Sequence, residues 1–135
     1  MSTSHRTRCL VAEDQALIGM AIEAYLEEVG MEVVGPFSSC KSAHDWVQDD
    51  TPDLALLDYK LKDGVCVELA RDLIRRGVPV VFYSGLAHGV ALPADLRDVI
   101  WIEKPADRDS LLDVLVCLAA AKPGVASNPS PGSLA

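Results

Sequence analysis

The chain has 135 residues, enough for one domain around a single core, and half of them are hydrophobic. The apolar stretches end well short of the roughly twenty residues that a membrane span needs, and no signal-peptide core follows the polar start of the chain. The formal net charge of −8 argues against nucleic-acid binding, which concentrates Lys and Arg on one face. We therefore expect a soluble, cytoplasmic protein that contacts neither membrane nor nucleic acid.

The four cysteines give no sign of a metal site. Cys9, Cys40, Cys66 and Cys117 are widely spaced, form no Cys-x-x-Cys pair, and in three cases lie inside apolar patterns. Such a pattern favours reduced, mostly buried thiols over metal ligands. A domain of this length needs no disulfide to hold it together.

The first half of the chain contains two predicted strands, each followed by a helix. An apolar run over residues 9–12 ends in Glu13-Asp14, and apolar residues then recur at helical spacing up to residue 29, where Gly30 is a typical helix stop. Residues 32–36 predict a brief second strand and a turn. Ser38-Ser39 offers a cap for the next helix, which ends before Pro52.

The central strand is predicted over residues 53–58, where an aliphatic run ends abruptly in Asp58. A strand that is buried on both faces is continuously aliphatic, as in parallel sheets. The loop that follows contains the turn signal Asp63-Gly64. The next helical stripe runs from residue 66 to 74 and ends at Arg75-Arg76-Gly77.

Two further strands complete the alternation. The fourth, over residues 78–83, ends in Ser84-Gly85, and the fifth, over 99–102, is followed by Glu103-Lys104-Pro105 and a last helix over 107–121. The segment 86–98 between them is interrupted by glycine and proline, which predicts a short or irregular fourth helix.

The alternation of five strands and helices predicts an α/β fold with a doubly wound parallel sheet. The flavodoxin-like (βα)5 plan has the strand order 2-1-3-4-5, with ligands bound at the switch between strands 1 and 3. These two strands end in Glu13-Asp14 and in Asp58. We place a flexible N-terminus at residues 1–6, the folded domain at 7–122 and a disordered Pro/Ser/Gly-rich tail at 123–135.

Three carboxylates at one edge of a sheet repel one another, at a cost of about 3 kcal/mol for a pair about 5 Å apart. A hard cation with oxygen ligands offsets this repulsion, and Mg²⁺ is the natural candidate. Lys104 adds a second positive charge, and Ser84 adds a hydroxyl beside an accessible glycine N–H. Carboxylate, metal, ammonium and hydroxyl together are what phosphoryl transfer needs.

These residues resemble the receiver domain of bacterial two-component response regulators, over about residues 7–121. The likeness is carried by strand-end residues in a fixed order: Glu13-Asp14, Asp58, Ser84 and Lys104-Pro105. It implies that Asp58 is a phosphoacceptor, which takes a phosphoryl group from a phosphohistidine on a sensor histidine kinase or a histidine phosphotransfer protein. It also implies that Lys104 and Ser84 contact the phosphoryl group.

The resemblance implies further roles. Mg²⁺ would be held by Glu13, Asp14, Asp58 and the backbone carbonyl of Lys60. Ser84 and Trp101 would form the switch that reports phosphorylation, Lys60 and Leu86 would modulate the lifetime of the phosphoryl group, and Pro105 would follow a cis peptide bond. The bulk of Trp101 and the shortened segment after Ser84 depart from the family pattern, so the oligomeric state stays open.

We expect a stand-alone, single-domain receiver whose output is contact with a downstream protein that the sequence does not name. One alternative is that the chain is a receiver fragment of a hybrid kinase or of a multidomain regulator. A less favoured alternative is an aspartate-nucleophile phosphatase of the haloacid dehalogenase type, which requires a second Asp two residues after the nucleophile. Lys60 occupies that position, so we expect a phosphoacceptor and not an enzyme that turns over small substrates.

Overall fold

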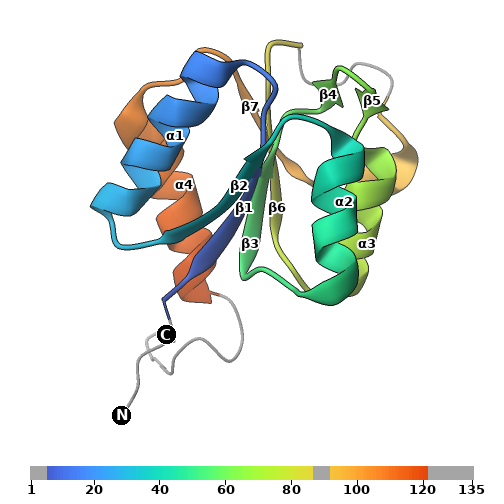
Figure 1. Cartoon of the computed structure of the whole chain (residues 1–135), viewed down its shortest axis with the longest axis horizontal. Coiled ribbons are helices and arrows are strands. Elements are labelled where there is room, and N and C mark those ends of the chain that lie inside the picture. The colour runs from blue at the N-terminus through green and yellow to red at the C-terminus, as the bar shows by residue number, and fades with distance from the viewer. Residues whose placement is uncertain (1–5, 87–91, 122–135) are drawn as a thin grey trace.

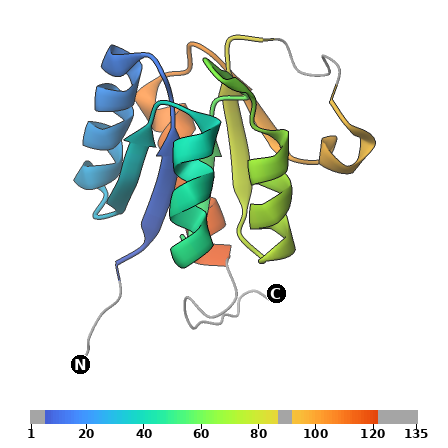
Figure 2. The same ribbon diagram turned by 45° about the vertical axis from the view of Figure 1, so that its right-hand side comes forward.

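The computed structural model describes residues 6–86 and 92–121 (Figures 1 and 2). Segments 1–5, 87–91 and 122–135 lie outside the described residues, so the expected flexible N-terminus, the expected disordered tail and the middle of the expected fourth helix are largely untested. The elements are, in chain order, β1 (Arg8–Ala12), α1 (Ala16–Glu28), β2 (Glu32–Phe37), α2 (Cys40–Asp49), β3 (Leu54–Leu57), β4 (Lys60–Leu61), β5 (Gly64–Val65), α3 (Val67–Arg75), β6 (Val80–Ser84), the 3-10 helix η1 (Ala94–Leu96), β7 (Ile100–Glu103) and α4 (Arg108–Ala121).

Five parallel strands form the main sheet, in the order β2-β1-β3-β6-β7. Since β6 and β7 are the fourth and fifth strands expected from the sequence, the predicted flavodoxin-like order is confirmed. The strand β3 lies at the centre, paired with β1 on one side and with β6 on the other. All four of its residues are buried, as its unbroken aliphatic sequence predicts.

Alternate residues of the strands enter two separate cores. On β3, Ala55 and Leu57 pack toward α2 and α3, whereas Leu54 and Leu56 pack toward α1 and α4. Figure 1 shows the two helix pairs on opposite faces of the sheet, and Figure 2 shows α2 and α3 side by side on one of them. Both faces are therefore covered, and the ends of the strands remain as the place for a site.

Strand β2 differs from the sequence prediction, because it continues through Gly35-Pro36 to Phe37 instead of turning. Its register against β1 shifts between Leu10 and Ala12. Gly35 has φ = 108°, and a Cβ atom there would lie 2.7 Å from the carbonyl oxygen of Val11. The glycine is thus needed for this close approach within a strand, which explains why the predicted turn is wrong.

The connection after Asp58 is a small antiparallel hairpin, β4–β5, where the sequence predicted a loop with a turn. The turn residue Asp63 reaches the start of α2, where its carboxylate accepts hydrogen bonds from the N–H groups of Cys40 (2.9 Å) and Lys41 (3.0 Å). These two bonds lower the pKa of Asp63. The hairpin is thereby tied to the neighbouring helix.

The prediction of four reduced thiols is wrong for Cys40 and Cys66, which form a disulfide. Their Cα atoms lie 5.6 Å apart although 26 residues separate them in the sequence. The contact arises because α2 and α3 pack side by side, and no local sequence spacing indicates it. Of the other two cysteines, Cys9 is buried and Cys117 is exposed.

The sequence predicted a short or irregular fourth helix between β6 and β7. In the described part of that segment, the single helical element is the short 3-10 helix η1, which agrees with the prediction. The edge of the sheet beside it is left partly open. A hollow of about 460 Å³ lies there, lined by residues that include Ile74, Val80 and Ile100. Ile74 and Ile100 are accordingly 42% and 40% exposed. Among the described helices, none combines the length and the apolar character that a membrane span requires.

Candidate functional site

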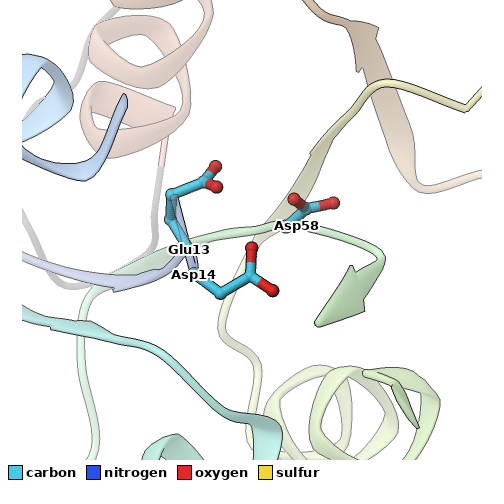
Figure 3. A group of neighbouring side chains, drawn as sticks. All are labelled: Glu13, Asp14 and Asp58. Carbon is cyan, nitrogen blue, oxygen red and sulfur yellow. The ribbon is translucent and has the colours of Figure 1, made fainter. Parts of the chain in front are cut away.

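Two neighbouring strands bring three carboxylates together at one edge of the sheet. Glu13 and Asp14 follow β1, and Asp58 follows β3 (Figure 3). The Asp58 N–H donates to the carbonyl oxygen of Ala12 (2.9 Å), which fixes the two strand ends against each other. One oxygen of each carboxylate lies within 4.8 Å of the others. The acid cluster expected from the sequence is therefore assembled.

The Lys104 side chain enters the same cluster from the end of β7. Its Nζ atom lies 2.8 Å from Asp58 Oδ2 and 2.7 Å from Glu13 Oε1. The Lys104 N–H donates to the carbonyl oxygen of Ser84 (2.8 Å), which holds the residue beside the end of β6. One ammonium thus bridges carboxylates from two different strands.

Burial of this bridge increases both the attraction between its charges and the cost of removing them from water. Glu13 is 4% exposed and Asp58 8% exposed. Burial by itself lowers the pKa of Lys104, but the hydrogen bonds and charges of Asp58 and Glu13 outweigh this effect, so the pKa is raised. Lys104 is therefore charged at neutral pH, and it offsets the repulsion within the acid pair.

Glu13 and Asp14 are placed differently although they are adjacent. Glu13 is buried, with Oε1 on Lys104 and Oε2 accepting a hydrogen bond from the N–H of Gln15 (3.0 Å). Asp14 is exposed to solvent. Within this cluster the Asp14 carboxylate makes no hydrogen bond or ion pair with the described residues, whereas the Asp58 carboxylate makes one, to Lys104. The donor set consists of oxygen atoms alone, as Mg²⁺ prefers.

A hollow of about 230 Å³ opens beside Asp58. It is lined by Gln15, Asp58, Lys60, Ser84, Gly85, Leu86 and Lys104. Four residues that were predicted to contact the phosphoryl group or to modulate its lifetime therefore line the same hollow: Lys60, Ser84, Leu86 and Lys104. Ser84 is 1% exposed, and its hydroxyl accepts a hydrogen bond from the N–H of Leu86 (3.2 Å).

Trp101, the expected switch residue, is half-buried on β7. Its ring centroid lies 5.4 Å from that of Tyr59 and 5.6 Å from that of Phe82. Its indole N–H donates to the carbonyl oxygen of Leu86 (3.0 Å). The segment just after Ser84 is thus hydrogen-bonded to Trp101. The peptide bond between Lys104 and Pro105 is cis.

Sequence reasoning missed two residues at this site. Gln15 lines the hollow, and Tyr83 lies behind Lys104, with its ring centroid 5.6 Å from Nζ. The Tyr83 hydroxyl accepts a hydrogen bond from the N–H of Ala106 (3.2 Å), just beyond Lys104-Pro105. The sequence signal that could have indicated Tyr83 is its place at the end of an aliphatic strand, directly before Ser84, where its hydroxyl group can reach the site.

The family model of the response regulator receiver domain matches residues 9–116. The chain belongs to this family. Such receiver domains are regulatory phosphoacceptors, and the strand order and the acid cluster of this receiver agree with that membership.

Solved structures and curated relatives support the same assignment. The receiver is 31% identical to SdrG from Sphingomonas melonis Fr1, with a TM-score of 0.71 over 86% of this chain and 98% of that one. The receiver domain of PhyR from Erythrobacter litoralis shares the fold, with a TM-score of 0.77 and 21% identity over 93% of this chain and 96% of that one. Transcriptional regulatory protein PdtaR from Mycobacterium tuberculosis is 27% identical over 111 residues, which cover 80% of this chain and 54% of PdtaR. The chain thus spans about half the length of this curated relative.

Proposed function

We propose that this receiver accepts a phosphoryl group on Asp58 from a phosphohistidine of a sensor histidine kinase or a histidine phosphotransfer protein. The observation that supports the proposal is the pair of short contacts that Lys104 Nζ makes with Asp58 and Glu13. A carboxylate that is nearly buried, next to a fixed ammonium and an open hollow, can act as a nucleophile toward a dianionic group. The predicted compartment for this transfer is the cytoplasm.

In the proposed transfer, an Asp58 carboxylate oxygen attacks the phosphorus atom. The new O–P bond forms as the N–P bond of the phosphohistidine breaks, and its electron pair stays on the imidazole nitrogen. Lys104 supplies positive charge to the phosphoryl oxygens, and Ser84 can donate its hydroxyl hydrogen to one of them. Lys60 and Leu86, which line the hollow, would control the access of water and hence the lifetime of the product.

The donor set fits Mg²⁺. Asp14, Asp58, the backbone carbonyl of Lys60 and, through water, Glu13 would hold the ion. This choice agrees with the short mutual distances of the three carboxylates and with the exposure of Asp14. When bound, Mg²⁺ would neutralise charge on the phosphoryl oxygens.

Incubation with acetyl phosphate and Mg²⁺ tests the proposal. We expect the intact mass to increase by that of one phosphoryl group, and we expect Asp58→Asn to abolish the increase. Asp113→Asn, at an exposed acid of α4, is the matched control and should be labelled like the unmodified protein. No added mass, or labelling that persists in Asp58→Asn, would contradict the proposal.

The phosphatase alternative makes a different prediction, namely continuous turnover of a phosphomonoester that Asp58→Asn abolishes. We expect no turnover, because Lys60 stands where a second Asp is required.

The fragment alternative changes the output and not the chemistry at Asp58. We propose that the output is contact with a downstream protein, triggered when phosphorylation disturbs the hydrogen bonds that connect Ser84, Leu86 and Trp101.

A further inference from the structure

The disulfide joins the start of α2 to the start of α3, next to the β4–β5 hairpin that connects Asp58 with α3. Cys40 is the first residue of α2, and Cys66 is the N-cap residue of α3. The Cα separation of 5.6 Å lies in the usual range for disulfides. Disulfides in cytoplasmic proteins are usually transient or redox-sensing and not permanent braces. The bond therefore points to a regulatory role in the compartment predicted for this receiver.

The disulfide is linked to the candidate site through the β4–β5 hairpin. The N–H of Cys66 donates to the carbonyl oxygen of Tyr59 (2.8 Å), the residue after Asp58. In the hairpin, Lys60 pairs with Val65, the neighbour of Cys66. The disulfide bond between Cys66 and Cys40 thus anchors the β4–β5 hairpin to α2. This hairpin begins with Lys60, whose backbone carbonyl is a proposed metal ligand.

A weaker, non-covalent tie spans the same gap. The Asp63 carboxylate accepts hydrogen bonds from the N–H groups of Cys40 and Lys41, but Asp63 is exposed. The net contribution of such hydrogen bonds is smaller than their strength in isolation, because water can take the place of either partner. Reduction of the disulfide would therefore remove the covalent tie between the hairpin and α2 and leave the two Asp63 hydrogen bonds, while Leu61 of the hairpin stays buried in the core.

Of the two sulfur atoms, a small thiol can reach that of Cys40, which is partly exposed, whereas Cys66 is buried. The other cysteines are poorly suited to replace this pair. Cys40 lines a hollow of about 320 Å³ between α2 and α3, together with Lys41, His44 and Val65. Burial raises the pKa of Cys9 to about 12, which suppresses its thiolate. Cys117 is exposed on α4, away from this hollow.

We propose that Cys40 and Cys66 form a reversible dithiol–disulfide switch that sets how firmly the β4–β5 hairpin is held, and hence how tightly the pocket binds Mg²⁺. On oxidation the two thiols lose two protons and two electrons to a small-molecule disulfide such as oxidised glutathione. One S–S bond forms in the protein, and one S–S bond breaks to give two glutathione thiols. The effect on phosphorylation rests on the proposed function, whereas thiol pairing and metal binding do not.

Thiol labelling tests whether the switch is reversible. The full chain is equilibrated in mixtures of reduced and oxidised glutathione, free thiols are alkylated, and the labelled cysteines are identified by peptide mass. We expect Cys40 and Cys66 to become labelled together in reducing mixtures and to be protected together in oxidising ones, with unchanged circular dichroism. A pair that never forms, or that opens only on unfolding, would overturn the proposal.

Calorimetric titration with Mg²⁺ alone tests the coupling, using the unmodified protein in both redox states. We expect the oxidised form to bind at least about fivefold more tightly, the lower end of typical coupling between sites. Cys40→Ser/Cys66→Ser should bind like the reduced protein under both conditions, and Cys117→Ser should keep the full response. Equal affinities in the two redox states, with the disulfide verified by mass, would overturn the coupling.

Acetyl phosphate labelling in parallel separates this proposal from the proposed function. If Mg²⁺ affinity follows the redox state but Asp58 gains no phosphoryl group, the phosphoacceptor proposal alone fails. If Asp58 is labelled equally well and Mg²⁺ affinity is unchanged in both states, the switch alone fails.

Discussion

Lys104 is the residue on which the electrostatics of the pocket depend. Lys104→Met would leave Glu13 and Asp58 facing each other in a largely buried site without a counterion. We expect the metal-free protein to lose about 2–3 kcal/mol of unfolding free energy, somewhat less than for a fully buried pair. Urea unfolding without divalent cations measures this loss.

The control for Lys104 is Lys60→Met, which removes an exposed lysine that lines the same hollow and makes no ion pair within the described residues. We expect this change to stay within about 0.5 kcal/mol. Similar losses for the two variants would show that the Lys104 contacts carry no special stability.

Tyr83 positions the segment that carries Lys104. Tyr83→Phe keeps the ring beside the ammonium but removes the acceptor for the partly buried N–H of Ala106. We expect a loss of about 1 kcal/mol in unfolding free energy, and slower labelling by acetyl phosphate because Lys104 loses one anchor.

Tyr25→Phe is the matched control for Tyr83, since the Tyr25 hydroxyl has no hydrogen-bond partner among the residues that the structure describes. It should leave both the stability and the labelling rate unchanged. If Tyr83→Phe behaved in the same way, the positioning role would be refuted.

At the scale of the elements, α2 and α3 are joined by a polar contact as well as by the disulfide. The carboxylate of Asp72 lies 2.9 Å from His44 Nε2 and 3.2 Å from Arg76 Nε. Arg76 in turn donates to the carbonyl oxygen of Val47 on α2 (2.6 Å). The hydrogen bond from His44 and the charge of Arg76 lower the pKa of Asp72 against the opposing effect of burial.

The pKa of an Asp carboxyl is about 3.9 in the unfolded chain. Because the pKa of Asp72 is lower in the folded protein, its ionised form stabilises the fold at pH values above about 3.9. This stabilisation is lost as the pH falls through the pKa of the folded state. We therefore expect Asp72→Asn to be about 1 kcal/mol less stable at pH 6, with the difference shrinking below about pH 4. Thermal melts across this range measure the difference. Asp113→Asn should show no such dependence, and a constant deficit for Asp72→Asn would contradict the assignment.

Most elements follow from sequence pattern, but three features do not. The aliphatic runs that end in Asp58 and in Ser84 were sufficient to place β3 and β6. The path of β2 through Gly35-Pro36 was not predicted, since that dipeptide ordinarily marks a turn. The two-residue strands β4 and β5 are too short for any periodicity, and the Cys40–Cys66 bond depends on packing between elements.

The same contrast holds for the site within the whole molecule. The convergence of Glu13, Asp14, Asp58 and Lys104 follows from topology alone, because parallel strands place their carboxyl ends at one edge. That Lys104 bridges Glu13 and Asp58 depends on side-chain geometry. The support from Tyr83 also could not be predicted, because its position inside a strand suggested only packing.

Mg²⁺ binding should stabilise the whole domain, because the folded pocket gathers acids that the unfolded chain keeps apart. At a Mg²⁺ concentration about 100 times the dissociation constant, linkage predicts a gain of about 2.7 kcal/mol. Thermal melts with Mg²⁺, against NaCl of equal ionic strength, measure the gain. Asp14→Asn should remove most of it, and melting curves that Mg²⁺ leaves unchanged would argue against a metal site.

The bridge made by Lys104 also has a consequence for biosynthesis. Its partner Asp58 precedes it by 46 residues, and Glu13 lies near the start of the chain. On the ribosome, where N-terminal segments emerge first, both acids are made well before the lysine that pairs with them. A partial sheet in which β1 and β3 were paired before β7 docked would carry this repulsion without its lysine. Of the five strands of this sheet, the one synthesised last, β7, is thus the one that brings the lysine to the pocket.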